Sequence, residues 1–460
     1  MLEQIKTHKI ILLQVVVIGL FYGFFAFDLE RSDFIKLITL YGALFFLSYK
    51  IIQLTGGNLN SNQFWSLAII GILFRLIFIG ALPNLSQDFY RFIWDGRLVF
   101  KGFNPYLFTP ESLIGENLFP DGKILISQAQ ELYNGMGPLN GSHYSNYPPI
   151  NQLCFAVAAL FAGKNILGSV VIMRILIILA DVGILYFGRK LLKSLGQSPH
   201  KIFWYFLNPF IIIELTGNIH FEGVMLFFLV WALYLLHSQK WVWAAVLIGV
   251  SVSVKLIPLL FLPLFFQRFL KTEKRGILKL LLFFSIVIGT VILTFLPFYS
   301  SQFVSNFMGT ISLWFQNFEF NASIYYIIRW IGFKAVGWNI IETTGKILPL
   351  VVLLFILILT FFRKNKNTQQ LLTAMLLAIA FYYLLSTTVH PWYIATPLLL
   401  ALFTKYKFPI IWSAVIMLSY SAYGINGFSE NLWLVSLEYL IVISFAIWEM
   451  YLKKKSVLYK

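Results

Sequence analysis

The stretch 86–106 holds the residues best suited to chemistry. If residues 88–100 form a helix, Asp88, Arg91 and Asp95 share one face, and apolar side chains cover another. Such a helix would lie along a membrane interface. A carboxylate just above the bilayer suits a general base that takes a proton from an acceptor hydroxyl. The same spacing also fits a solvated interface helix whose Asp and Arg side chains only pair with each other.

Two polar groups follow where apolar segments begin or end. The segment 144–151 contains Pro148 and Pro149, and consecutive prolines make a rigid bend. That bend suits one wall of a substrate site or a simple entry turn to a helix. Farther along, Asn218, His220 and Glu222 lie within five residues of one another. They could hold a sugar, or they could cap a turn between two helices.

Later positions add cations and aromatic side chains. Lys255 stands alone at the end of an apolar run, where a cation suits a lipid-linked phosphate or simply reaches the interface. Glu319 and Arg329 belong to another polar segment. His390 opens a His-Pro-Trp-Tyr run that suits either a site or an aromatic belt at the membrane surface.

The elements that carry these groups must be membrane spans. Apolar residues make up 59% of the 460 residues and charged residues only 12%, against about 25% charged in soluble domains. This excludes a soluble enzyme, a secreted scaffold and a disordered chain. The single cysteine, Cys154, can form no intrachain disulfide. No P-loop, GxGxxG after a strand, or HExxH occurs, so nothing supports ATP, nucleotide-sugar or haem chemistry.

The apolar runs predict an all-α polytopic membrane protein with a bundle of about 12–14 transmembrane helices. The whole chain, 1–460, is expected to form a single integral membrane domain. The predicted spans are 9–27, 34–53, 63–83, 166–189, 201–217, 221–237, 241–256, 257–269, 277–297, 344–362, 369–388, 392–405, 408–424 and 431–451. The pair 241–256 and 257–269 could instead be one helix broken by proline.

Basic loops predict the orientation, since Lys and Arg stay on the cytoplasmic side. With the N-terminus inside, the positive residues of the inner loops and tail account for much of the +16 net charge, so no nucleic-acid partner is expected. Those residues are Lys6, Lys9, Arg189, Lys190, Lys193, Lys201, Lys240, Arg268, Lys271, Lys274, Arg275, Arg363, Lys364, Lys366, Lys405, Lys407 and 453–455.

Most acidic residues then fall outside, together with two long loops. The first, 84–147, is expected to be the catalytic extracytoplasmic loop with interface helices, and 299–343 to be the second outer loop. This arrangement requires segment 148–163 to be re-entrant or to lie near the outer surface, and 318–334 to be an outer-face helix. Within the spans, the charged side chains of Arg174 and Asp181 share a helix face and are expected to face the protein interior.

An ordered set of motifs resembles the GT-C class of membrane glycosyltransferases. It is most similar to bacterial mannosyltransferase-like proteins and more distantly to the catalytic subunit of the first mannosyltransferase of GPI-anchor synthesis. The motifs are Gln87-Asp88-Phe89-Tyr90-Arg91-Phe92-Ile93-Trp94-Asp95-Gly96-Arg97, Gly102-Phe103-Asn104-Pro105-Tyr106, Tyr147-Pro148-Pro149, Asn208-Pro209, Gly217-Asn218-Ile219-His220-Phe221-Glu222, Val254-Lys255-Leu256-Ile257-Pro258 and His390-Pro391-Trp392-Tyr393.

The resemblance implies a GT-C-like bundle and inverting transfer of a hexose, mannose by similarity, from a polyprenyl-phosphate-linked donor to a glycan or glycolipid acceptor. It implies Asp88 as the catalytic base, with Asp95 assisting it or holding Arg91. The candidate substrate-binding residues are Tyr90, Arg91, Arg97, Asn104, Tyr106, Tyr147, Asn218, His220, Glu222, Lys255, Glu319, Arg329, His390 and Tyr393. Many members of the class have a second acid beside the base, where this chain has Gln87. One carboxylate is a poor site for a hard cation, so no metal ligand is assigned, and a divalent cation is the one cofactor left open.

Other functions stay open from the residues alone. A lipid-linked-sugar transporter or flippase would need polar residues through both halves of the membrane, and the inner half here is nearly all apolar. An oligosaccharide polymerase or ligase would be expected to rely on outer arginines and a large late loop. A non-catalytic assembly subunit need not keep an acid at position 88. The sugar, the acceptor and any membrane partner subunit are not identified by the sequence.

Overall fold

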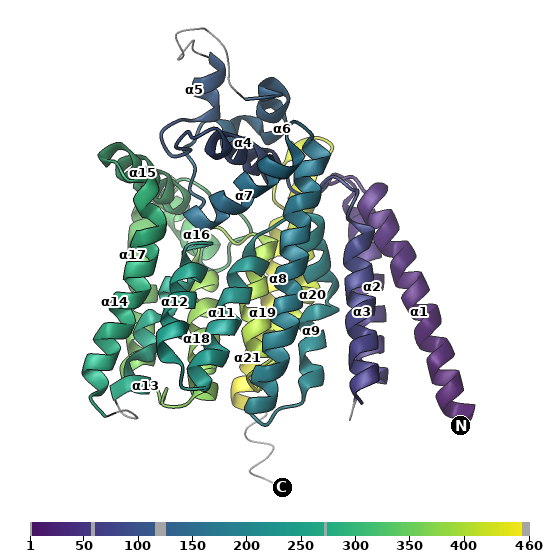
Figure 1. Ribbon diagram of the computed structural model, residues 1–460. Helices are drawn as coiled ribbons and strands as arrows, with labels where there is room; N and C mark the ends of the chain where they lie inside the picture. Colours follow the sequence, from purple (N-terminus) through teal and green to yellow (C-terminus); the bar gives the residue numbers. More distant parts are fainter. Residues whose placement is uncertain (1, 57–59, 116–125, 271–273, 453–460) are drawn as a thin grey trace.

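The computed structural model describes residues 2–56, 60–115, 126–270 and 274–452. Within them the chain is helical apart from a small antiparallel pair, β1 (Tyr423–Gly424) and β2 (Gly427–Phe428), so the predicted all-α class is confirmed. Figure 1 shows a bundle of roughly parallel and antiparallel helices covered at one end by a layer of tilted helices. Residues 116–125 of the first long loop, Lys271 and the tail lysines 453–455 lie outside the described residues.

Within the described residues, seven helices are long and apolar enough to cross a membrane, and they make the chain an integral multi-pass membrane protein. An eighth span results if the helices on either side of the break at 218–221, which are bent by 115°, are counted together. The long helices are α1 (Leu2–Phe27), α2 (Phe34–Leu54), α8 (Ile166–Ser194), α14 (Gly276–Phe295) continued by η4 (Leu296–Phe298), α17 (Ile341–Phe361), α18 (Thr368–Leu385) and α21 (Leu432–Ile447) continued by η7 (Trp448–Leu452).

Several of the other predicted spans are shorter apolar helices. Prolines explain part of this, because they lack an N–H donor and loosen or break the helix where they stand. Pro258 and Pro263 lie in a 3-10 segment, and Pro391 and Pro409 stand at helix starts. The shorter elements are α3 (Ser61–Ile77), α12 (Trp241–Val252), η3 (Ile257–Phe265) with α13 (Phe266–Leu270), η5 (Pro391–Ile394) with α19 (Ala395–Ala401), and α20 (Phe408–Val415) with η6 (Ile416–Ala422).

The segment between α8 and α12 reverses direction inside the bundle. It consists of η1 (Pro199–Ile202), α9 (Phe203–Phe206), α10 (Pro209–Ile211), η2 (Ile212–Gly217) and α11 (Glu222–His237). The polar run 218–222 therefore lies at the bend between η2 and α11.

A layer of helices lies at the end of the bundle opposite both chain termini (Figure 1). It contains α4 (Asp88–Phe100), α5 (Pro110–Gly115), α6 (Ala129–Gly141), α7 (Pro149–Ala162), α15 (Ser301–Gln316) and α16 (Ile324–Val336). We call this layer the cap.

Segments 148–163 and 318–334 were predicted not to cross the membrane, and their helices, α7 and α16, lie in the cap. The helix α7 has only 14 residues and packs against α4 rather than crossing the bundle. The two helices touch at Gly96, where a Cβ would lie 2.3 Å from the carbonyl oxygen of Phe155, so only glycine fits. The helix α16 also lies at the cap end of the bundle.

Charged side chains inside the bundle are paired within the protein. Arg75 Nε donates to Asp181 at 2.8 Å, and both side chains are fully buried. Arg174 donates to the carbonyl oxygens of Thr216 and Gly217 at 2.8 Å each, and also to those of Ile79 and Ala81. The predicted inward orientation of Arg174 and Asp181 is therefore confirmed. Arg174 joins the two segments that lead to positions 88 and 218.

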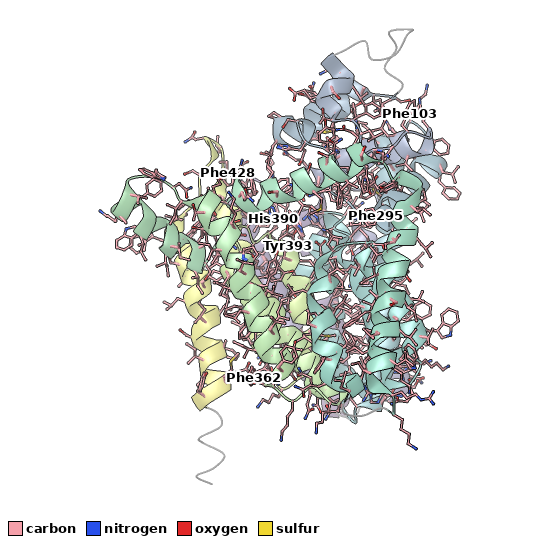
Figure 2. All side chains as sticks on the ribbon, turned by 90° about the vertical axis from the view of Figure 1, so that its left-hand side faces the viewer. Phe103, Phe295, Phe362, His390, Tyr393 and Phe428 are labelled. Atoms are coloured by element: carbon pink, nitrogen blue, oxygen red, sulfur yellow. The ribbon has the colours of Figure 1, made fainter. Side chains whose placement is uncertain are left out.

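The basic loops lie at the end that carries the termini. Figure 2 places Phe362, next to Arg363, at that end, and His390 and Tyr393 close below the cap. Arg189, near the end of α8, stacks on Phe64 at the start of α3. The distribution of basic residues between the two ends thus follows the pattern expected from the sequence.

Candidate active site

Asp88 lies at the first turn of α4, where the cap meets the bundle. The Leu85 backbone N–H donates to Asn218 Oδ1 at 3.2 Å, which ties the segment before α4 to the turn before α11. Asn140, at the end of α6, donates from Nδ2 to Asp88 Oδ1 at 3.3 Å. A carboxylate in the first turn of a helix also benefits from the unpaired N–H groups there. Residues distant in sequence therefore fix the position of Asp88.

The surroundings of Asp88 make it a stronger base than a solvated aspartate. Burial raises its pKa above the usual value, while the hydrogen bond from Asn140 and the charges of Lys255 and Arg31 partly offset this rise. A carboxylate with a raised pKa holds a proton more firmly and is better suited to general base catalysis near neutral pH.

Glu222 and Lys255 form an ion pair beside Asp88. The Lys255 ammonium donates to Glu222 Oε1, and the Lys255 side chain is 20% exposed. Glu222 Oε2 is buried and has no hydrogen-bond partner among the described residues, and Asp88 lies within electrostatic range. The Ile150 N–H donates to the carbonyl oxygen of Ser253 at 2.9 Å, which fixes the start of α7 against the segment before Lys255. One carboxylate oxygen of Glu222 is therefore available to a ligand.

The turn between η2 and α11 carries backbone strain. Ile219 has a φ of 59°, a left-handed conformation that is rare for a β-branched residue. Such strain persists only where the surrounding structure enforces it, and it is frequent at functional sites. The strained residue lies between Asn218 and His220, two of the predicted site residues.

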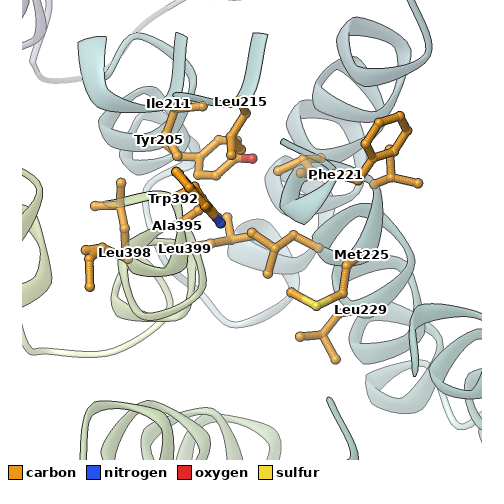
Figure 3. Packing of buried hydrophobic residues seen from close by; sticks show 14 of the residues in the cluster. Tyr205, Ile211, Leu215, Phe221, Met225, Leu229, Trp392, Ala395, Leu398 and Leu399 are labelled. Atoms are coloured by element: carbon orange, nitrogen blue, oxygen red, sulfur yellow. The ribbon is translucent and has the colours of Figure 1, made fainter. Parts of the chain in front are cut away.

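Aromatic rings stack in a column beside this turn. The centroid of the His390 ring lies 5.1 Å from that of Phe320 and 4.5 Å from that of Trp392. The ring centroids of Trp392 and His220 are 3.6 Å apart. Figure 3 shows Trp392 packed close to Tyr205, Ile211 and Leu215 of the bundle. Burial, with the charges of Arg31 and Lys255, lowers the pKa of His390 to about 3. His390 is therefore neutral at physiological pH and supplies a hydrogen-bonding group rather than a charge.

The structure brings together several predicted site residues from separate segments. The charge of Asp88 acts on both Tyr147 and Tyr393, and that of Lys255 acts on His220 and His390. We call this group the polar centre; it consists of Asp88, Asn140, Tyr147, Asn218, His220, Glu222, Lys255, His390 and Tyr393.

Asp95 belongs to a buried network next to the polar centre. It accepts hydrogen bonds from Arg91 Nε at 2.8 Å, Ser145 Oγ at 2.6 Å and Gln152 Nε2 at 3.1 Å. Arg91 also donates to the carbonyl oxygens of Asn140 and His143, at 2.5 and 2.8 Å. These contacts hold the end of α6, and with it Asn140, against α4. The structure thus places Asp95 where it holds Arg91, one of the two roles considered from the sequence.

Four other predicted residues have contacts within the cap or between the cap and neighbouring segments. Asn104 donates to the Phe298 carbonyl at 2.9 Å, and the Tyr106 hydroxyl donates to the Tyr147 carbonyl at 2.7 Å. Arg97 donates to the carbonyl of Lys164 at 3.0 Å. The Tyr90 ring lies against Gly135 of α6. Asn104, Tyr106 and Arg97 thus use these side-chain donors in hydrogen bonds within the protein.

Glu319 and Arg329 form a second cluster. Arg329 donates to Glu319, which also accepts from the Tyr325 hydroxyl at 2.6 Å. The segment beside this cluster meets the polar centre through its backbone, since the Val389 N–H donates to the Phe320 carbonyl at 2.8 Å. Arg329 is therefore already paired, and the cluster supports the segment that carries His390.

Two residues beside Asp88 escaped sequence reasoning. Asn140 is one of many polar residues in the first long loop, and nothing in its spacing marks it. Arg31 lies in the short loop between α1 and α2, and its guanidinium stacks on Tyr423, 3.3 Å from the ring centroid. One signal existed for Arg31: it is a basic residue in a loop predicted to lie outside, where positive charge is disfavoured.

The donor set offers little to a metal ion. Across the described residues, no three or more His, Cys, Asp or Glu side chains form a group that could hold one. In the polar centre Asp88 and Glu222 are the carboxylates, and Glu222 is held by Lys255.

Curated proteins with similar sequences are mannosyltransferases. The chain is 26% identical over 207 residues to alpha-(1->6)-mannopyranosyltransferase A of Corynebacterium glutamicum, covering 43% of this chain and 39% of that protein. It is 24% identical over 200 residues to the protein of the same name from Mycobacterium tuberculosis, covering 43% of this chain and 36% of the other. The match thus spans about two fifths of the length of each relative.

A sequence model of the family described as alpha-(1->6)-mannopyranosyltransferase, N-terminal domain, matches residues 30–270, which is more than half of the chain. That region includes Asp88, the strained turn at Ile219 and Lys255. The chain therefore belongs to this family of membrane mannosyltransferases.

Proposed function

We propose that the chain transfers a mannosyl residue from a polyprenyl-phosphate-linked donor to a hydroxyl of a glycan or lipid-linked acceptor. The family membership supports the sugar and the reaction class. The multi-pass architecture and the position of the polar centre close below the cap support a donor that is itself anchored in the membrane.

The proposed reaction is a single displacement with inversion at the anomeric carbon. Asp88 accepts the proton of the acceptor hydroxyl while the hydroxyl oxygen forms the new bond to that carbon. The bond between the anomeric carbon and the phosphate oxygen breaks, and the lipid phosphate leaves with the bonding electron pair. The half-buried position of Asp88 and its raised pKa support this role.

Other residues of the polar centre are assigned to binding. The unpartnered Glu222 Oε2 is placed to accept a hydrogen bond from a sugar hydroxyl, and Lys255 holds that carboxylate in position. Neutral His390 and the Tyr393 hydroxyl offer further hydrogen-bonding groups near Asp88. Asp95 acts as a positioning residue through Arg91 and Asn140.

The reaction is proposed to take place on the extracytoplasmic side. Basic residues gather at the end with both termini, and the polar centre lies at the other. Because positive loops stay in the cytoplasm, the cap faces outward.

The observation that carries the proposal is the half-buried carboxylate of Asp88, which accepts a hydrogen bond from Asn140 beside the Glu222–Lys255 pair. Its test is Asp88→Asn in proteoliposomes supplied with polyprenyl-phosphate-mannose, with transfer followed by mass spectrometry of the product. Loss of a general base is expected to slow transfer about 10²–10⁴-fold while thermal stability changes little. The matched control is Asp28→Asn, because Asp28 is an exposed aspartate paired with Lys36. Full transfer by Asp88→Asn would remove Asp88 as the base.

A further inference from the structure

Arg31 is a cation at the edge of the polar centre. It lies in the loop between α1 and α2, and Asn84 holds this region by donating to the carbonyl oxygens of Phe25 and Leu29 at 2.8 and 2.9 Å. Asn84 stands four residues before Asp88, so the loop that carries Arg31 runs beside the segment that carries the base.

Among the residues that the structure describes, the side chain of Arg31 has no ion-pair partner. Its Nε is buried and makes no hydrogen bond, and no carboxylate lies within 4.0 Å of the guanidinium, among the described residues. Its one ring contact there is the stack on Tyr423. Its charge nevertheless acts on Asp88 and His390, so it lies within electrostatic range of the polar centre.

Other cations of the site region are already paired. Lys255 is bound to Glu222, Arg91 to Asp95 and Arg329 to Glu319. A partly buried charge without a counter-ion is costly, and a bound anion would remove that cost. A purely structural role for Arg31, stacking on Tyr423 to hold the β1–β2 pair, would leave the guanidinium charge and its Nε donor unused.

We propose that Arg31 binds the phosphate of the prenyl-linked donor and stabilises it as the leaving group; this rests on the proposed function. The guanidinium fork matches phosphate oxygens, and its stack on Tyr423 fixes its plane. The donor phosphodiester carries one negative charge. When the bond to the anomeric carbon breaks, the phosphate gains the bonding electrons and a second negative charge, so Arg31 binds the product side more strongly than the donor.

The proposal reassigns the phosphate contact. The sequence suggested Lys255 as a cation for a lipid-linked phosphate, but Lys255 is paired with Glu222. Of the other candidate groups, Arg329 is paired with Glu319, and His390 is neutral. Inorganic phosphate and the head groups of bulk phospholipids present the same chemistry, so the experiment must separate them from a prenyl phosphate.

The test measures binding to the full-length protein in nanodiscs. The probes are farnesyl phosphate, farnesol, inorganic phosphate and phosphatidylglycerol vesicles, and the variants are Arg31→Gln and Arg189→Gln. Arg189 is the matched control, because it also stacks on an aromatic ring but lies near the end of α8 that carries the basic loops. We expect Arg31→Gln to weaken farnesyl phosphate binding about 10- to 100-fold, which is the range for a lost charged hydrogen bond, and to leave farnesol binding unchanged. Arg189→Gln should bind both probes as the unmodified protein does.

Several results would overturn the proposal. One is that Arg31→Gln binds farnesyl phosphate within twofold of the unmodified protein. Another is that the unmodified protein binds farnesyl phosphate and farnesol equally. A third is that phosphatidylglycerol vesicles or inorganic phosphate compete with farnesyl phosphate as effectively as farnesyl phosphate itself. If Arg31→Gln does not fold, Arg31→Lys decides the matter. It keeps a cation and should retain a preference for farnesyl phosphate over farnesol, and loss of that preference in a folded lysine variant contradicts the proposal. Arg31-dependent binding without any mannosyl transfer from farnesyl-phosphate-mannose would reject the proposed function and leave the anion site standing.

Discussion

Replacing Asp95 with asparagine tests whether Asp95 takes part in the reaction or only positions other residues. Asp95 is fully buried and accepts hydrogen bonds from Arg91, Ser145 and Gln152. Asparagine has nearly the same shape but no charge, and either orientation of its amide points an NH₂ group at one of these donors. The change therefore breaks the network without removing side-chain volume.

The magnitude follows from the burial of the pair. Removing one partner of a buried ion pair leaves an uncompensated charge, here on Arg91, at a cost of about 3–5 kcal/mol of stability. Arg91 also fixes Asn140 through its carbonyl, and Asn140 donates to Asp88. A loosened Asn140 shifts the base, and a displacement of about 1 Å can cost roughly 10²-fold in rate.

Two measurements check this prediction: thermal unfolding of the purified protein in detergent, and the pH dependence of transfer in proteoliposomes. Asp95→Asn should unfold at a lower temperature. The acid limb of its pH–activity curve should move to higher pH, because the hydrogen bond from Asn140 lowers the pKa of Asp88 and the variant weakens that bond. The double variant Arg91→Met/Asp95→Asn should lose less stability than the sum of the single variants, since no buried charge remains. Normal stability with loss of transfer as complete as in Asp88→Asn would refute the positioning role and make Asp95 a catalytic residue.

Other predictions follow from the same contacts. Gly96→Ala places a Cβ 2.3 Å from a backbone oxygen of α7 and should cost about 1–3 kcal/mol in thermal stability, whereas Gly309→Ala on α15 meets nothing within 4 Å and should be neutral or slightly stabilising; equal melting temperatures would contradict this. Arg174→Met leaves four carbonyl acceptors unpaired and should lower stability by at least about 3 kcal/mol, and an unchanged melting temperature would argue against its role. Transfer should decline as the pH falls through the raised pKa of Asp88, because only the carboxylate accepts a proton, so a midpoint at or below about 4 would be inconsistent with the site. EDTA should change transfer by less than about twofold, since Asp88 and the Lys255-bound Glu222 are a thin ligand set for a hard cation; a large loss restored by Mn²⁺ would show otherwise.

Much of the fold could be predicted from the sequence, because apolar runs and prolines carry the information locally. The apolar segments became helices, and the requirement that basic loops share one side identified α7 as part of the cap instead of a crossing. The lengths of the crossings were harder to predict. Hydropathy alone does not show where a helix such as η3, with Pro258 and Pro263, tightens into a 3-10 segment.

The candidate site could be predicted only in part. Asp88, His220, Glu222, Lys255, His390 and Tyr393 stood in recognisable motifs and meet in the structure. Their pairings depend on contacts across many residues, such as the 52-residue separation of Asn140 and Asp88. The pairing of Lys255 with Glu222, and the lack of such a partner for Arg31 among the described residues, are likewise properties of the fold alone.

The movement of charge during the proposed reaction explains why Arg31 and Asp88 lie near each other. Before transfer, Asp88 carries a negative charge, and Arg31 helps to keep its pKa from rising further. As Asp88 takes the acceptor proton it becomes neutral, and an equal negative charge appears on the departing phosphate. A cation already paired with a carboxylate, as Lys255 is, would have to break that pair to follow the charge. An unpaired arginine within electrostatic range of the base can stabilise the charge at both positions, and its field then favours the transition state as well as the resting carboxylate.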